Sequence, residues 1–273
     1  MKSRKRNGAL DVLRFFSALA IVYFHMALPG SEYALSALPV FVLLSVTFGY
    51  GKPLGERAAR LLIPWAFWCA VYFAMKLADI AVTGSTFAEE FHYWMILSGP
   101  AIHLWYLPFM FLFFLFAAQI PNRLLLPVLS IVSVLSYLAF VSHELGPPFS
   151  QWASVIPAAS VGVAMKISKF PRAIGITAFA VFTAVYVATH ESLALQNTIA
   201  LALVIGFFML PFGASALTGK LSNLSFGIYL THPIFASIAH KLHPDVGYLT
   251  YAFVVAASII ATILLQKRLS FSV

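Results

Sequence analysis

Charged residues are scarce in this sequence. They make up 10% of the 273 residues, while 61% are apolar. An ordinary soluble domain has about 25% charged and about 45–50% apolar residues. A soluble globule needs a polar shell around its core, and so few charges cannot supply one. The composition therefore excludes a soluble globular protein and indicates an integral membrane protein.

Cysteine is rarer still. The single cysteine, Cys69, excludes an intrachain disulfide framework and a zinc site built from cysteines, and its apolar neighbours favour a packing role. No ligand spacing among the histidines indicates a metal site, so none is predicted. Acidic residues number 9 against 17 basic ones, a balance that in a soluble protein would suggest nucleic-acid binding.

Long apolar stretches, in contrast, are abundant. Helices of about 17–25 apolar residues cross a bilayer, and continuous apolarity, unlike alternation, argues against barrel strands. Candidate spans cover residues 10–29, 36–51, 61–80, 102–120, 124–141, 151–166, 172–189, 195–212, 224–241 and 248–266. We expect an all-α, polytopic integral membrane protein with about ten transmembrane helices in one bundle. Residues 1–273 would form a single transmembrane domain that begins with a short basic segment, 1–9.

The placement of the charges orients these helices. With the N-terminus in the cytoplasm, nearly all lysines and arginines fall in inner loops, where membrane proteins concentrate them, and most acidic residues fall in outer loops. Both termini are therefore expected on the cytoplasmic side. The excess of basic residues is therefore explained by the orientation of the helices in the membrane, and nucleic acid is not an expected partner. Five histidines fall in or near outer loops, where we expect them to be solvated: His92, His143, His190, His240 and His243.

Ionisable residues inside a span are costly and are therefore candidates for function. In the first span, Asp11 and Arg14 are followed by His25, eleven residues after Arg14. At about 100° per residue, this spacing puts Arg14 and His25 on one helix face, roughly 16 Å apart along the axis. The alternative is an interfacial pair of Asp11 and Arg14 with a packing histidine, and composition alone favours neither.

Two further stretches carry candidates near the ends of spans. Arg57 and Arg60 precede an apolar run and share a helix face, so they could clamp phosphate groups, although anchoring at the inner surface is the simpler explanation. His103, Trp105 and Tyr106 lie at the outer mouth of the fourth span. An interfacial aromatic belt explains the two aromatic residues but not the histidine beside them.

The ninth span holds Tyr229 and His232, which face the same way, and Pro233 follows directly. Proline has no N–H, so it frees a backbone carbonyl near residue 229, and Gly227 allows close approach of another helix. A histidine and a proline at membrane depth suggest a lined cavity.

Together, these stretches resemble the acyltransferase 3 family of polytopic membrane acyltransferases, which O-acylate cell-surface sugars and related acceptors. The resemblance rests on four stretches that occur in the family's order, namely Leu10–Arg14 with His25, the pair Arg57 and Arg60, His103–Leu107, and Ser225–Pro233. The chain departs from the family pattern where Ser45 is followed by Val46 in place of glycine.

The resemblance implies that cytoplasmic acetyl-CoA donates an acyl group to an acceptor on the outer side of a membrane, expected to be the bacterial cytoplasmic membrane. Arg57 and Arg60 would hold the donor's phosphates, with Arg14 lining the path from that side. His25 would be the general base or a transient acyl carrier. Asp11 would fix Arg14 in place.

On the acceptor side, Tyr229, His232 and His103 would orient the acceptor hydroxyl or stabilise the oxyanion. Trp105 and Tyr106 complete the expected substrate-binding group with His103. The acceptor is expected to be a carbohydrate or glycolipid, such as an exopolysaccharide. No metal is expected, and the oligomeric state stays open.

Two other functions are compatible with these residues. A transporter or flippase for a lipid-linked glycan or a small acid would line a permeation path with the same polar groups and catalyse no reaction. A structural assembly subunit would tolerate substitution of Arg14 and Arg60.

Overall fold

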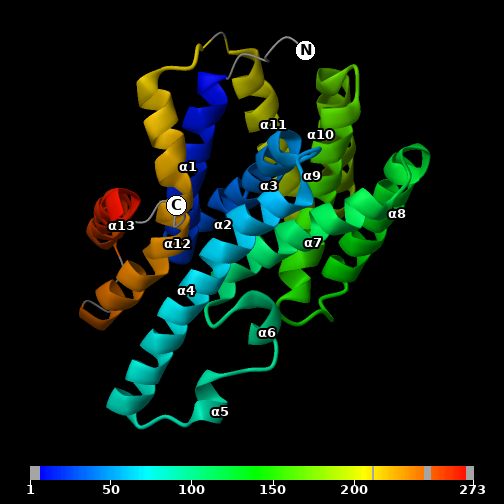
Figure 1. The fold of residues 1–273 in the computed structure, drawn as a ribbon. Helices are drawn as coiled ribbons and strands as arrows, with labels where there is room; N and C mark the ends of the chain where they lie inside the picture. The colour runs from blue at the N-terminus through cyan, green and yellow to red at the C-terminus, as the bar shows by residue number, and fades with distance from the viewer. Residues whose placement is uncertain (1–6, 211, 243–246, 269–273) are drawn as a thin grey trace. The chain divides into compact units, whose positions relative to one another are not determined.

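The computed structural model describes residues 7–210, 212–242 and 247–268. Over these residues the chain folds into helices joined by short connections (Figure 1), with one isolated bridge between Asn7 and Gly213 as the only β-type pairing. The prediction of an all-α protein is therefore confirmed. Residues 1–6 of the predicted basic segment, and His243, lie outside the described residues.

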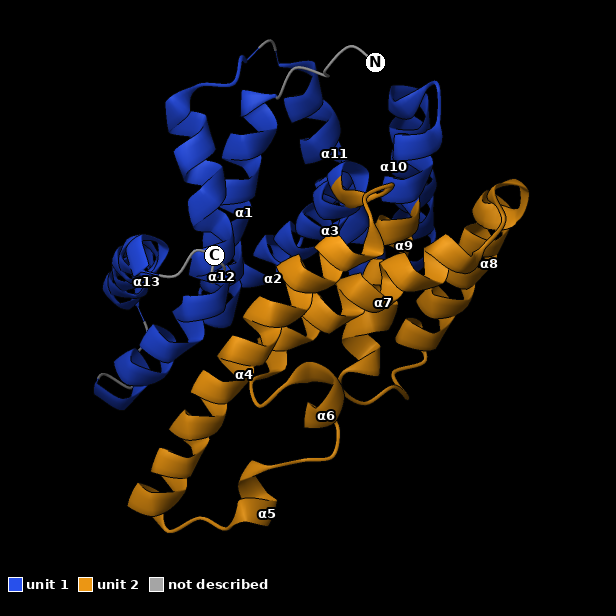
Figure 2. Ribbon diagram, viewed as in Figure 1, with its two compact units in different colours: residues 1–48, 161–271, 273 blue, residues 49–160, 272 orange. Residues whose placement is uncertain are grey.

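The chain divides into two compact units, shown in separate colours in Figure 2. Unit 1 comprises the described residues up to 48 and from 161 onward, and unit 2 comprises residues 49–160. The boundaries fall inside two helices, α3 (Ala37–Gly49) and α9 (Phe149–Ile167). The arrangement of all helices in one bundle stays a prediction.

Besides parts of α3 and α9, unit 1 contains helices from both ends of the chain. They are α1 (Gly8–His25), α2 (Ser31–Ala34), α10 (Pro171–Thr189), α11 (Ser192–Met209), α12 (Ala216–Leu242) and α13 (Tyr248–Arg268). Unit 2 contains α4 (Leu54–Thr83), α5 (Phe87–Glu90), α6 (Met95–Ser98), the 3₁₀ helix η1 (Ile102–Trp105), α7 (Tyr106–Gln119) and α8 (Asn122–Val141).

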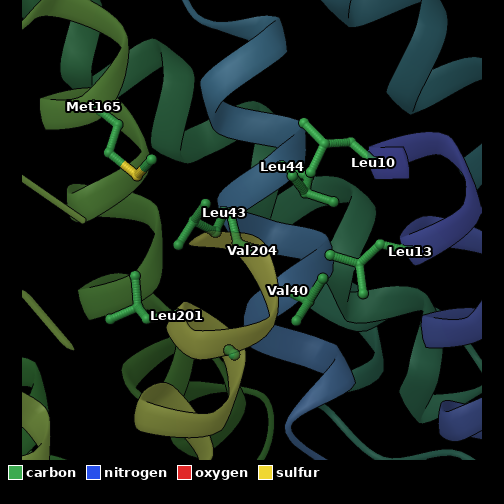
Figure 3. Close-up of a cluster of buried hydrophobic side chains, with 9 residues drawn as sticks. Leu10, Leu13, Val40, Leu43, Leu44, Met165, Leu201 and Val204 are labelled. Carbon is green, nitrogen blue, oxygen red and sulfur yellow. The ribbon is translucent and has the colours of Figure 1, made fainter. Parts of the chain in front are cut away.

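Helix α1 is the centre of unit 1, where it packs against α2, α11, α12 and α13. Near its start, Leu10 and Leu13 join a buried cluster with residues of α3, α9 and α11, such as Leu43 and Val204 (Figure 3). Further along, a second buried cluster joins α1 to α12 and α13. Packing along its whole length fixes α1, so the polar side chains that project from it have defined positions.

The starts of α1 and α12 lie side by side. The Asn7 side chain caps α1 by accepting a hydrogen bond from the Ala9 backbone N–H at 2.9 Å, and the Gly8 N–H donates to the Phe212 carbonyl at 3.1 Å. A Cβ atom at Gly8 would collide with the Gly213 carbonyl, so this approach requires glycine. Because the end of α1 also meets a residue further along α12, as described below, α1 and α12 run parallel.

In unit 2, α4 packs against α7. It ends at Gly84, whose φ of 73° is the left-handed conformation that commonly terminates a helix. The connection that follows is tied back to α4, because the Lys76 ammonium donates to the Glu90 carboxylate at 2.9 Å. A capping box between Thr86 and Glu89 orders the same turn.

Eight helical segments among the described residues are long and apolar enough to cross a membrane. They correspond to eight of the predicted spans and are Gly8–His25, Ser31–Gly49, Leu54–Thr83, Ile102–Gln119, Asn122–Val141, Pro171–Thr189, Ser192–Met209 and Tyr248–Arg268. The other two predicted spans, 151–166 and 224–241, are also helical, in α9 and α12. They differ from the eight because they carry more polar side chains, several of which are buried, including Ser160, Ser225 and His232.

Candidate functional site

The end of α1 and the middle of α12 bring two histidines together in unit 1. The ring centroids of His25 and His232 are 5.1 Å apart, with an angle of 35° between the ring planes. His25 is exposed at the last position of α1, whereas the side chain of His232 is 0% exposed. The pair therefore offers one imidazole to an incoming molecule and keeps the other inside the unit.

Pro233 determines how His232 is held. Since proline has no N–H, the carbonyl four residues earlier, that of Tyr229, loses its helical partner. The His232 ring hydrogen-bonds the Tyr229 backbone, and its Nδ1 lies 3.1 Å from the Ile228 carbonyl oxygen. A carbonyl oxygen can only accept, so Nδ1 carries the proton in this contact.

Tyr229, predicted beside His232, lies next to it in the structure. Their ring centroids are 6.2 Å apart, and the Tyr229 ring also lies 6.5 Å from that of Phe41. The Tyr229 side chain is buried. It therefore packs beside the histidine pair from α12, on the same helix as His232.

Asp11 and Arg14 lie near the start of α1. Asp11 is buried, and Arg14 is half-buried with its guanidinium carbon 5.4 Å from the centre of the Phe48 ring. Because α1 continues without interruption from Gly8 to His25, the predicted spacing of Arg14 and His25 along one helix is present.

The two predicted arginines of unit 2 have different surroundings. Both lie near the start of α4, as predicted; the helix begins at Leu54, directly after Pro53, and Glu56 complements its first turn. The Arg57 side chain is only 7% exposed, and its guanidinium carbon lies 4.1 Å above the Phe114 ring. Arg60 is exposed.

Arg57 also keeps an unused hydrogen-bond donor. Its buried Nε has no hydrogen-bond partner among the described residues. A buried donor without a partner is costly. An anion or another acceptor bound at that nitrogen would therefore stabilise this part of unit 2. Arg60 has the open access that a bound phosphate requires.

His103, Trp105 and Tyr106 are all buried at the junction of η1 and α7. The His103 ring meets the edge of Tyr72 at a centroid distance of 5.0 Å, and Trp105 packs on Phe109 at 5.8 Å. The aromatic residues of this stretch therefore form a packed core in unit 2, and His103 lies inside it.

A model of the acyltransferase 3 family, described as an acyltransferase domain, matches residues 7–267. The chain belongs to this family. No curated protein and no solved structure matches the chain at the same stringency. Membership in the acyltransferase 3 family makes this a membrane acyltransferase, in agreement with the several apolar helices of the structure.

In this member of the acyltransferase 3 family, the predicted site residues fall into two groups. Unit 1 contains Asp11, Arg14, His25, Tyr229 and His232, and unit 2 contains Arg57, Arg60, His103, Trp105 and Tyr106. Of the histidines expected in outer loops, those within the described residues are exposed, namely His92, His143, His190 and His240.

Sequence reasoning missed Tyr72, which contacts His103, and Trp68, which contacts Tyr72. Tyr72 and Trp68, one helical turn apart on α4, are both buried, and their ring centroids are 6.0 Å apart. The buried Trp68 Nε1 has no hydrogen-bond partner within the part of the chain that is described. The spacing of four residues on an apolar helix was the available signal, but it does not distinguish a site from lipid-facing aromatic residues.

Proposed function

We propose that this protein is a membrane O-acyltransferase that moves an acyl group, acetyl in the first instance, from cytoplasmic acyl-CoA to a hydroxyl of an extracytoplasmic or lipid-linked carbohydrate. The observation that carries the proposal is the exposed His25 backed by the buried His232, in a chain of an acyltransferase family. Imidazole changes its charge near neutral pH and acts as a base or as a nucleophile.

Two routes are open to His25. As a general base, it takes the proton of the acceptor hydroxyl while that oxygen attacks the thioester carbonyl; the C–S bond breaks, and the coenzyme A thiolate leaves and takes up the proton. As an acyl carrier, a ring nitrogen attacks the thioester carbonyl, the C–S bond breaks and the coenzyme A thiolate leaves; the acceptor oxygen then attacks the acyl carbon, the C–N bond to the ring breaks, and the hydroxyl proton is taken up by the thiolate. Both routes form one ester and release one thiol.

The cationic side chains would recognise the donor. Arg60 is exposed and Arg57 offers an unused Nε, and guanidinium groups bind phosphate through two parallel hydrogen bonds. Arg14 provides a further cation, and the buried Asp11, one helical turn earlier on α1, orients it. The proposed reaction uses no metal.

Side chains without a fixed charge would bind the acceptor. Tyr229 lies beside the histidine pair and would orient the acceptor hydroxyl or stabilise the oxyanion. In unit 2, His103 would bind substrate while Trp105 and Tyr106 hold its surroundings rigid. An exopolysaccharide or another cell-surface polysaccharide is the proposed class of acceptor.

We also propose that α9 and α12 cross the membrane, which gives ten spans with both termini in the cytoplasm of a bacterial cell. The parallel packing of α12 along α1 supports this topology, because α1 is itself a candidate span. With a rise of about 1.5 Å per residue, the 19 residues of α9 and the 27 of α12 are long enough to reach across most or all of a bilayer core.

The test is to incubate the purified protein with acetyl-labelled acetyl-CoA, and to measure thiol release and labelled product with membrane glycans as acceptors. We expect His25→Ala to abolish both signals at an unchanged protein level, and His92→Ala, an exposed histidine in a connection, to match the wild type. Full activity of His25→Ala would refute the proposal.

Family membership does not favour the transporter or flippase. The same assay separates the two functions. Movement of an unmodified solute across proteoliposomes without consumption of acetyl-CoA would support transport instead.

A further inference from the structure

His232 lies beyond the reach of a substrate. Its side chain is 0% exposed, while its neighbour His25, at the end of α1, is exposed. Only one of the two rings can therefore meet a donor or acceptor molecule without a rearrangement of unit 1. Any contribution of His232 to the reaction has to pass through His25.

The contacts of His232 also select its tautomer. Nδ1 is directed at the Ile228 carbonyl at 3.1 Å, and the ring hydrogen-bonds the Tyr229 backbone, whose carbonyl Pro233 has released from the helix. Carbonyl oxygens accept hydrogen bonds and cannot donate, so a neutral His232 carries its proton on Nδ1. The other ring nitrogen, Nε2, then carries a lone pair and can only accept.

The neighbour that can donate to this lone pair is His25. The two ring centroids lie 5.1 Å apart, a separation that one shared water can bridge. If the proton of neutral His25 is on the nitrogen nearer His232, the lone pair of His25 is on its other nitrogen. That nitrogen is the one available to a substrate.

We propose that His232 is a positioning residue for His25, which holds the His25 ring in the reactive tautomer through Nε2 and stabilises the imidazolium that forms when His25 takes a proton. In this arrangement His25 is the base and His232 orients it. The Ile228 and Tyr229 carbonyls are the third member, because they fix the tautomer of His232. The inference rests on the proposed role of His25 as the reacting imidazole.

Two substitutions of His232 by residues with a side-chain amide test the two ring nitrogens separately. Glutamine at position 232 extends its amide to the place of Nε2 and can present an acceptor oxygen there, whereas asparagine reaches only the place of Nδ1. We expect His232→Gln to retain most of the turnover, and His232→Asn to lose about 10²-fold in kcat, as for other groups that orient a base. KM for acetyl-CoA should change by less than about twofold, because His232 does not touch the donor.

His240→Ala is the matched control, since His240 is an exposed histidine on the same helix. It should keep the wild-type kcat and KM. Thermal unfolding of each variant in detergent separates lost folding from lost positioning. A measurement on the wild type needs no variant: ¹⁵N NMR of histidine-labelled protein should assign the Nδ1–H tautomer to His232.

Three results would overturn the inference. They are an Nε2–H tautomer at His232, equal turnover of folded His232→Gln and His232→Asn, and a large rise in KM with unchanged kcat in His232→Asn. His25→Ala, assayed in parallel, tests the proposed function separately. An inactive His25→Ala together with a fully active His232→Asn would leave the proposed function standing and refute only the positioning role.

Discussion

At the scale of single residues, burial distinguishes side chains that the sequence presents as equivalent. Arg57 and Arg60 are three positions apart on α4, yet Arg57 is buried against Phe114 and Arg60 is exposed. A desolvated cation over an aromatic ring contributes about 2 kcal/mol, and the arginine stem adds apolar packing. Arg57 is therefore expected to stabilise unit 2 in addition to offering its Nε to the donor, whereas Arg60 is expected to act on the donor alone.

Because of this difference, we expect one alanine substitution to lower stability and the other to weaken donor binding. Arg57→Ala should lower the free energy of unfolding by about 1–3 kcal/mol, because it removes the ring contact and leaves a cavity. Arg60→Ala should leave the unfolding temperature unchanged and raise KM for acetyl-CoA about tenfold, the value of one charge-assisted phosphate contact. Thermal unfolding in detergent and steady-state kinetics check both.

Arg57→Lys is the control for this pair, because lysine keeps the charge but lacks the flat guanidinium that lies on Phe114. It should unfold at a temperature between those of the wild type and Arg57→Ala. Equal destabilisation by Arg57→Ala and Arg60→Ala, or an unchanged KM in Arg60→Ala, would contradict this division of roles.

At the scale of elements, one ion pair, Lys76 with Glu90, helps to hold the connection from α4 to η1 against α4, beside the contact of the Phe73 and Phe91 rings at 5.0 Å. The Lys76 ammonium and its hydrogen bond hold the pKa of Glu90 below its usual value. A lowered pKa in the folded state means that the contact is present above the carboxyl's unfolded pKa of about 4.3 and is lost as the pH falls through the lower folded value. The contribution of this ion pair is thus present at neutral pH and lost in acid.

Hydrogen exchange measures this loss. Relative to the intrinsic exchange rate at each pH, amides of residues 84–94 should be more protected at pH 7 than in acid below the lowered pKa of Glu90. Lys76→Met should show the lower protection at both pH values, and Glu144→Gln, which alters an exposed carboxyl elsewhere in unit 2, should behave as the wild type. Slow exchange in Lys76→Met at pH 7 would show that other contacts hold the connection.

The two helices with more polar side chains make a second prediction at this scale. If α9 crosses the membrane, the connections before and after it lie on opposite sides. In a Cys69→Ala background, cysteines introduced at Ser142 and Lys169, both exposed, should then react with an impermeant maleimide from opposite sides of sealed vesicles. Labelling of both from the same side would show that α9 does not cross.

At the scale of the whole molecule, the sequence was informative where local rules decide. Apolar length located the helices, the helical period placed Arg14 and His25 on one uninterrupted helix, and the chemistry of Pro233 anticipated that the Tyr229 carbonyl takes a partner outside the helical pattern. Capping and period are properties of neighbouring residues, so they can be evaluated without the rest of the chain.

Contacts between distant segments could not be predicted in the same way. His25 meets His232 more than 200 residues later, and Tyr72 meets His103 from another helix, because packing between helices depends on the whole fold. The same limit explains why, among the described residues, only eight of the ten predicted spans are apolar enough to qualify by composition alone. A polar side chain lowers the mean hydropathy of α12 wherever it points, although Ser225, Thr231 and His232 are buried and face no lipid.

Ten spans with both termini inside predict that acyl transfer has a direction. In the proposed topology the arginines face the cytoplasm, and acetyl-CoA, the proposed donor, is too polar to cross a bilayer, so it would reach them only from that side. Sealed inside-out vesicles should therefore transfer label from added acetyl-CoA to glycan, whereas right-side-out vesicles should transfer label only after detergent opens them. His25→Ala vesicles of both orientations are the control for label that is bound without transfer. Equal transfer by both kinds of intact vesicle would contradict the direction, and transfer only by intact right-side-out vesicles would reverse the orientation that the charges predict.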